Sequence, residues 1–148
     1  MAIASKLDHE GVRVYCICGD GELQEGQVWE ALMTASHYKL DNLCLIVDNN
    51  NLQIDGKVNE VMNIYPLEDK FKSFGFEVIT IDGHNMEKII RAFEKAKTIK
   101  GKPTVIIAKT IKGKGVSFME NIASWHGKAP NEEEYNKAMN ELKEIRND

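Results

Sequence analysis

The chain has 148 residues, the size of a single domain, and its composition of 43% hydrophobic and 28% charged residues is ordinary for a globular protein. Its formal net charge is -4 and its lysines are spread among acidic residues, which excludes the basic surface typical of a nucleic-acid-binding protein. No apolar run approaches the roughly 18 residues that span a bilayer. We therefore predict one domain over residues 1–148 with neither nucleic acid nor a membrane as partner.

Three cysteines are present, and none of their spacings is typical of a zinc site. Cys16 and Cys18 share one face of a predicted strand, because successive side chains of a strand alternate, and Cys44 lies in a second apolar run. We interpret all three as small buried thiols. Free thiols indicate a reducing compartment, and we expect a cytoplasmic protein.

The first third of the chain predicts a helix, a strand, a second helix and a second strand. Residues 1–7 have the pattern of the last turns of a helix, and the apolar run 12–18 predicts the first strand. After Gly26, apolar residues recur at helical spacing, and the run 43–47 then predicts the second strand. The expected buried stripe of the second helix consists of Val28, Ala31, Leu32 and Ala35.

The middle of the chain repeats this alternation. Pro66 at the first helical position opens a short helix that Gly75 ends, and residues 76–81 predict the third strand. Asn85 caps the next helix, and residues 104–108 predict the fourth strand. The expected buried stripe of the helix after Asn85 consists of Ile89, Ile90, Phe93 and Ala96.

A long loop then leads through Pro130 to the last predicted helix. Asn131 and Glu134 resemble a capping box at its start. Its apolar stripe consists of Tyr135, Ala138, Met139 and Leu142. Strands that alternate with helices in this way predict an α/β fold, with a parallel sheet covered by flanking helices on both faces.

Polar residues gather where the predicted strands end. Residues 19–21 (Gly-Asp-Gly) follow the first strand, and residues 48–51 (Asp-Asn-Asn-Asn) follow the second. For any one such loop, an ordinary polar connection is the simpler interpretation. Taken together, however, the two loops would meet at the ligand-binding edge of a parallel sheet. Carboxylate and amide oxygens suit Mg²⁺, whose shell substrate phosphates often complete. The pair therefore predicts a metal–phosphate site.

Longer segments around these loops resemble the thiamine diphosphate fingerprint of transketolases. The matching segments are residues 19–26 (Gly-Asp-Gly-Glu-Leu-Gln-Glu-Gly), 30–32, 48–56, 82–84 (Asp-Gly-His), 109–115 and 124–130 (Ser-Trp-His-Gly-Lys-Ala-Pro). They occur in the family's order and cover essentially the whole chain. The run Leu-Gln-Glu-Gly at 23–26 favours transketolase over related synthases and dehydrogenases that use the same cofactor. The chain most resembles the N-terminal section of a transketolase encoded as two chains, which implies the thiamine diphosphate-binding fold.

The resemblance implies a role for each matched residue. Asp20 and Asn50 match side chains that bind magnesium, and the backbone carbonyl of Leu52 completes the protein ligands. Gly21 matches a glycine that binds the diphosphate, and Ile54 occupies a position near the thiazolium ring. The complete implied cofactor-binding set is Gly19, Asp20, Gly21, Glu22, Asn50, Leu52, Ile54 and His126.

His126 is the implied catalytic residue, because it matches a histidine that reaches both the diphosphate and the substrate. An isolated loop histidine is more often incidental, but the flanking residues of the 124–130 segment favour the functional role. Glu25 and Glu30 match acids near the subunit interface, although simple charge placement at a helix N-terminus also explains them. Asp48 is expected to orient the asparagine loop, whereas Asn49 and Asn51 are simple turn residues in the plainer interpretation.

The activity that the resemblance implies is two-carbon ketol transfer between sugar phosphates, as in the pentose phosphate pathway. The protein would bind and orient thiamine diphosphate through Mg²⁺. In the resembled family, the acid that activates the cofactor's aminopyrimidine ring lies in a different domain. A glycine-rich segment and several substrate-contacting histidines precede the matched region.

We therefore expect a chain incomplete at its N-terminus that needs a pyrimidine-binding partner chain, the C-terminal transketolase section. By itself it would have weak activity or none. We also expect self-association, because missing N-terminal helices would leave apolar surface exposed.

Two other functions remain as alternatives. The first is a non-catalytic remnant or interaction module that keeps the fold without binding the cofactor. The second is a nucleotide-binding α/β domain, which is disfavoured because the Gly-x-Gly of residues 19–21 lacks the third glycine of that fingerprint at the required spacing.

Overall fold

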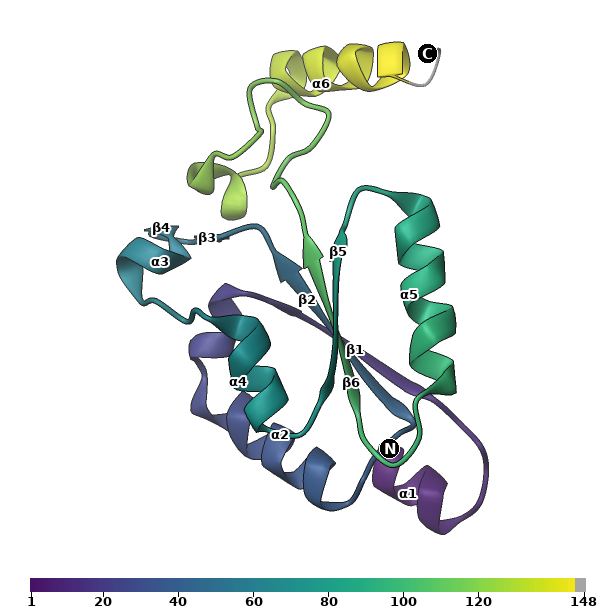
Figure 1. Ribbon diagram of the computed structural model, residues 1–148. Helices are drawn as coiled ribbons and strands as arrows, with labels where there is room; N and C mark the ends of the chain where they lie inside the picture. Colours follow the sequence, from purple (N-terminus) through teal and green to yellow (C-terminus); the bar gives the residue numbers. More distant parts are fainter. Residues whose placement is uncertain (146–148) are drawn as a thin grey trace.

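A computed structural model describes residues 1–145, and a four-stranded parallel sheet lies at its centre (Figure 1). The strands are β1 (Val14–Gly19), β2 (Leu43–Asn49), β5 (Glu77–Asp82) and β6 (Thr104–Lys109). Their order across the sheet is β1-β2-β6-β5. The predicted α/β fold with a parallel sheet is therefore confirmed, while residues 146–148 of the predicted domain lie outside the described residues.

Helices and short turns connect the strands in the predicted order. The helices are α1 (Ala2–Leu7), α2 (Gly26–His37), α3 (Val58–Val61), α4 (Leu67–Ser73), α5 (Met86–Thr98) and α6 (Glu132–Ile145). The 3-10 turns are η1 (Gly21–Gln24) and η2 (Ala123–His126), and a small antiparallel hairpin is formed by β3 (Leu52–Gln53) and β4 (Gly56–Lys57). No helix within residues 1–145 combines the length and apolar character needed to cross a membrane.

Two separate cores cover the two faces of the sheet, with α2 and α4 on one face and α5 on the other (Figure 1). The first core is the larger. In it Phe71 of α4 is fully buried and stacks on Trp29 of α2, with 5.7 Å between ring centroids. The second core consists of small residues of α5 against the centre of the sheet, with Ala92 and Ala96 packed on Cys44 and Ile106.

The expectation that helices cover both faces of every strand is wrong for β1. This strand is an edge of the sheet, and its side chains Tyr15 and Ile17 are 44% and 73% exposed. Helix α5 packs over β2, β5 and β6, and it reaches β1 through a T-shaped contact between Phe93 and Tyr15. For the same reason the thiols are not all buried: Cys44 in the central β2 is buried, whereas Cys16 in β1 is exposed.

Three expected helix details also need correction. Ile90 is 62% exposed, because it lies about 200° around α5 from the buried Ala92. Ala31 of α2 is exposed as well, and the half-buried Trp29 contributes to the core instead. Pro66 caps α4 from outside with an extended backbone rather than occupying its first helical position.

The N-terminal caps of the last two helices are as predicted, but the apolar stripe of α6 is not a core. Asn85 accepts a hydrogen bond from the Lys88 amide at 3.0 Å. Asn131 and Glu134 exchange reciprocal bonds of 2.8 and 2.9 Å in a capping box. Of the four predicted stripe residues of α6, only Ala138 is buried. Helix α6 stands apart from the sheet (Figure 1) and is joined by Glu141 to Ser117 of the preceding loop.

Candidate metal and phosphate site at the carboxyl edge of the sheet

The parallel register brings the ends of all four strands to one edge of the sheet. Gly19 of β1 lies opposite Asp48 of β2, and Asp82 of β5 lies opposite Lys109 of β6. Immediately after β1, the amide of Asp20 donates to the carbonyl of Asp48 at 3.0 Å. This bond connects the two loops that carry the predicted ligands.

The carboxylate of Asp20 is buried, with 1% of the residue exposed, and its two oxygens have different surroundings. Oδ2 accepts from Asn49 Nδ2 at 2.8 Å and from the Asn51 amide at 2.5 Å. Oδ1 has no hydrogen-bond partner among the described residues. Burial raises the pKa of Asp20 above its usual value, although the hydrogen bonds from Asn49 and Asn51 and the nearby Gly21 amide act in the opposite direction. One oxygen of this buried acid is therefore available to a cation or a donor.

The asparagine loop is shaped by its own side chains. Asn50 Oδ1 accepts from the Leu52 amide at 2.9 Å, which fixes the amide group against the start of the hairpin. Asn51 has a φ of 60°, in the left-handed region that asparagine tolerates better than most residues. Its side chain donates to Asn59 Oδ1 and accepts from the Asn59 amide, which anchors the loop to α3.

A close backbone approach joins the first loop to the hairpin. A Cβ atom on Gly21 would lie 3.0 Å from Gln53 Cβ, so glycine at this position lets η1 contact β3. The amide of Gly19, in contrast, already donates to Glu22 Oε2 at 2.5 Å. The structure thus brings Asp20, Gly21 and the segment 50–52 together, as the sequence predicts.

Tyr65 belongs to this cluster although no sequence pattern points to it, and Asn49 has a larger role than the turn position expected for it. Asn49 is the last residue of β2 rather than a turn residue, and besides Asp20 its Nδ2 donates to the Tyr65 hydroxyl at 2.6 Å. Burial raises the pKa of Tyr65. The period-two pattern of β2 could have identified Asn49, because Leu45 and Val47 of the same face point into the first core. Tyr65 lies in an irregular segment that carries no such signal.

The ends of β5 and β6 form the other side of this edge. Thr110 Oγ1 hydrogen-bonds Asp48 Oδ1, and the Gly83 amide donates to the Lys109 carbonyl at 2.8 Å. His84 Nε2 accepts from the Ile111 amide at 2.7 Å. A cavity of about 350 Å³ opens here, lined by Asn49, Asn50, Asn51, Tyr65, Lys109 and Thr110.

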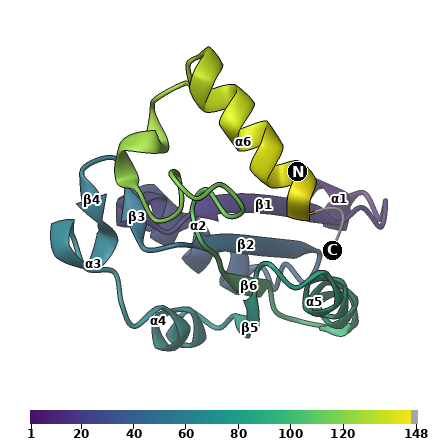
Figure 2. The same ribbon diagram turned by 90° about the horizontal axis from the view of Figure 1, so that it is seen from above.

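Two predicted site residues lie outside this cluster. Ile54 is 71% exposed in the turn of the hairpin, and His126 is exposed in η2. The η2 turn contacts β3, and Figure 2 shows it beside the hairpin. Trp125 fixes η2, since its indole donates to the Phe118 carbonyl at 3.0 Å. The secondary candidates are both exposed: Glu25 caps the N-terminus of α2, and Glu30 lies within that helix.

The donor set at the edge suits magnesium better than a transition metal. No three His, Cys, Asp or Glu side chains of residues 1–143 gather in a way that could hold a metal ion. The predicted ligands Asp20, Asn50 and the Leu52 carbonyl are all oxygen donors, and they include a single carboxylate. Mg²⁺ is commonly held by one or two carboxylates together with substrate phosphates. The unpartnered, buried Asp20 Oδ1 fits such an ion.

An open parallel sheet with polar groups at its carboxyl edge places the chain in the class of α/β domains that bind ligands at the ends of their strands. Comparison with known proteins specifies the family. The model of the "Transketolase, thiamine diphosphate binding domain" matches residues 4–144. The chain therefore belongs to the transketolase family, as its resemblance to the fingerprint segments predicts.

Individual relatives agree with this assignment. The chain is 44% identical over 144 residues to an apulose-4-phosphate transketolase subunit from Phocaeicola vulgatus, covering 97% of this chain and 51% of that protein. It is 46% identical over 142 residues to the 6-deoxy-6-sulfo-D-fructose transketolase subunit SqwG of a Clostridium species, covering 96% of this chain and 52% of that protein. The chain thus spans about half the length of these curated relatives.

A solved structure supports the fold directly. The crystal structure of a transketolase from Campylobacter jejuni superimposes with a TM-score of 0.89 at 40% sequence identity. The match covers 96% of this chain and 23% of that one. The four-stranded sheet and its helices are therefore the fold of a transketolase domain.

The hydrogen bonds of Asn49 should contribute to the stability of the fold. Asn49→Ala should lower the free energy of unfolding by about 1–3 kcal/mol, because a buried carboxylate oxygen and a partly buried hydroxyl both lose a hydrogen bond. Urea unfolding followed by circular dichroism measures this change. Asn140→Ala, on an exposed position of α6, is the matched control and should change it by less than about 0.5 kcal/mol. Equal stabilities of the two variants would contradict a structural role for the Asn49 bonds.

Proposed function

We propose that the chain is the diphosphate-binding component of a transketolase and binds thiamine diphosphate through Mg²⁺. The observation that carries this proposal is the buried Asp20 carboxylate, with one oxygen fixed by Asn49 and Asn51 and the other without a partner among the described residues. A buried carboxylate with an unpaired oxygen destabilises the fold unless a cation or a hydrogen-bond donor reaches that oxygen. Membership of the transketolase family supports thiamine diphosphate as the ligand that brings the cation.

Three groups of this chain would hold the ion: the Asp20 carboxylate, the Asn50 side-chain oxygen and the Leu52 carbonyl. The fixed geometry of the loop supports this assignment, because Asn50 is already oriented by the Leu52 amide. Gly21 would present its backbone N–H to a phosphate oxygen. The close packing of Gly21 on Gln53 supports this role, because it keeps the backbone in place. Gly19 and Glu22 would contribute to cofactor binding indirectly, because the hydrogen bond between them shapes the start of η1.

Two exposed residues would complete the contacts to the cofactor and substrate. Ile54 would offer apolar surface to the thiazolium region, and its exposure leaves it free to do so. His126 would donate hydrogen bonds from its ring to oxygens of the diphosphate and of the substrate. Anchoring of η2 by Trp125 supports a fixed position for His126.

The reaction class is two-carbon ketol transfer between sugar phosphates. When bound, thiamine diphosphate supplies the carbon nucleophile and the electron sink for this transfer. The chain's own contribution would be to bind the diphosphate, to neutralise its charge through the ion and to direct the His126 ring to the substrate. We further propose that residues 1–148 act as one domain in the cytoplasm, where sugar phosphates of the pentose phosphate pathway are available.

A partner chain is part of the proposal. Two of the relatives are named as subunits of transketolases, which supports a separately encoded, pyrimidine-binding C-terminal section. The chain alone would then be an incomplete active site. Self-association is supported by the exposed apolar side chains of β1, since exposed patches of this kind favour association.

A calorimetric titration tests cofactor binding. The purified chain should bind thiamine diphosphate only when Mg²⁺ is present, and Asp20→Ala should weaken this binding at least about 100-fold, because it removes a charged ligand of the ion. Asp8→Ala removes the same charge at an exposed position beyond α1 and should leave binding unchanged. The absence of binding by the unsubstituted chain would instead support a non-catalytic module that keeps the fold.

An activity assay tests the need for a partner. The purified chain by itself should not transfer a ketol group from a ketose phosphate to an aldose phosphate, because no acid of the chain is assigned to the aminopyrimidine ring. Addition of the pyrimidine-binding section of a two-chain transketolase should produce turnover that His126→Ala reduces. Robust turnover by the chain alone would refute the incomplete half-site.

A further inference from the structure

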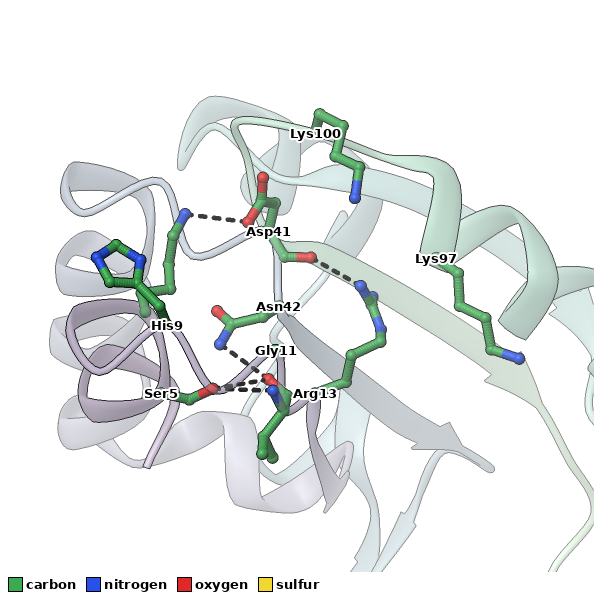
Figure 3. A pocket seen from close by; sticks show the side chains of 10 residues that line it. Ser5, His9, Gly11, Arg13, Asp41, Asn42, Lys97 and Lys100 are labelled. Carbon is green, nitrogen blue, oxygen red and sulfur yellow. Dashed lines mark hydrogen bonds and ion pairs between the residues drawn. The ribbon is translucent and has the colours of Figure 1, made fainter.

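A second polar cavity lies at the opposite edge of the sheet, before the strands begin (Figure 3). Its walls come from α1, the segment before β1, the turn before β2 and the end of α5, and its volume is about 490 Å³. Arg13 immediately precedes β1 and Asn42 immediately precedes β2, whereas the Asp20 site follows these strands. The cavity is therefore separate from the proposed cofactor site.

Positive charge dominates this cavity. Lys6, Arg13, Lys97 and Lys100 line it, and Asp41 is its one acidic lining residue among the described residues. Asp41 is already engaged, since Oδ1 pairs with Lys6 at 3.0 Å and Oδ2 accepts from the Gly101 amide at 2.9 Å. Lys97 pairs with Glu94 at 2.7 Å.

Two cations remain outside these ion pairs, although Lys100 lies close enough to Asp41 to help the Gly101 amide lower the pKa of that carboxyl. Neither Arg13 nor Lys100 forms an ion pair with any side chain of residues 1–143. In Figure 3 the Lys100 amine and the Arg13 guanidinium point toward the same space beside Asp41. Two unpaired positive charges facing one cavity favour an anion that carries two negative charges.

The guanidinium of Arg13 is held in place before any ligand binds. Nη1 donates to the Asp41 carbonyl at 3.2 Å and Nη2 to the Ala96 carbonyl at 3.1 Å. These bonds connect the turn before β2 with the end of α5. A fixed guanidinium loses little conformational entropy when it binds an oxyanion, which favours affinity.

The cavity wall also contains two buried polar atoms without hydrogen-bond partners among the described residues. They are Arg13 Nε, a donor, and Asn42 Oδ1, an acceptor. The amide nitrogen of Asn42 is fixed by the carbonyls of Ala2 and Val12, so its oxygen cannot turn to find another partner. Unpaired buried groups cost free energy, and a ligand that carries both an anionic acceptor and a hydroxyl donor would satisfy this pair.

From these observations we propose that the cavity binds a small phosphomonoester that carries a hydroxyl group. Its phosphate lies between Arg13 and Lys100, and its hydroxyl donates to Asn42. The volume is within the range of about 300–1,000 Å³ that is usual for sites of small organic ligands. This inference does not depend on the proposed transketolase activity.

A nuclear magnetic resonance titration at low ionic strength tests the proposal, with glycerol 3-phosphate as the probe. The amides of Gly11, Asn42 and Gly101 should shift in a saturable way. Lys100→Ala should weaken binding about tenfold, because it removes one charge-assisted contact. Lys88→Ala removes the same charge from an exposed position at the start of α5 and should leave the affinity unchanged. Lys100 is exposed and unpaired, so its removal should not disturb the fold.

Two further probes test the ligand chemistry. Inorganic phosphate should bind more weakly than glycerol 3-phosphate, and glycerol alone should not bind. Three results would overturn the proposal: no saturable shifts at the three amides, shifts confined to Gly21 and Asn51 at the other edge, or an unchanged affinity in both Lys100→Ala and Arg13→Gln. Equal affinity for the two phosphates would refute the contact to Asn42.

Discussion

The Asp20 carboxylate lies almost completely buried at the end of an edge strand, and only one of its oxygens is hydrogen-bonded by the described residues. A buried, half-satisfied carboxylate costs free energy, and an unpaired acceptor alone accounts for about 1–3 kcal/mol. That is a considerable part of the roughly 5–15 kcal/mol by which a typical domain is stable. The surrounding structure sustains this arrangement through Asn49, Asn51 and the Asp48 carbonyl, all of which belong to the end of β2 or its loop.

The sheet register explains why one carboxylate can organise the whole edge. Since Gly19 lies opposite Asp48, and Asn49 and Asp82 both lie opposite Lys109, the four strand ends are level. Loops that are far apart in the chain then meet within hydrogen-bonding distance. The two edges differ in chemistry, with a carboxylate and amides after the strands and unpaired cations before them. The edge after the strands suits a phosphate held through a bridging cation. The edge before the strands suits a separate phosphate ligand held by direct contacts with cationic side chains.

Much of the fold and part of the site could be predicted from the sequence. The strands, the caps of α5 and α6 and the meeting of Asp20 with the segment 50–52 follow from local periodicity and the rule for strand ends. Tyr65 could not be predicted, because its contact with Asn49 depends on tertiary packing across an irregular segment. The exposure of Ile17 could not be predicted either, because an apolar strand pattern does not reveal whether a strand lies at an edge. The same limit applies to the α6 stripe, since periodicity identifies an apolar face but not what covers it.

The central claim is that Asp20, Asn50 and Leu52 form the magnesium site that anchors a diphosphate. Crystals grown with thiamine diphosphate and Mn²⁺ in place of Mg²⁺ test it most directly, because the anomalous scattering of manganese locates the ion without reference to the protein density. We expect an anomalous peak bonded to Asp20 Oδ1, Asn50 Oδ1 and the Leu52 carbonyl, together with phosphate oxygens. A bound cofactor whose manganese ion is ligated by other residues, or which binds with no ion at this edge, would contradict it.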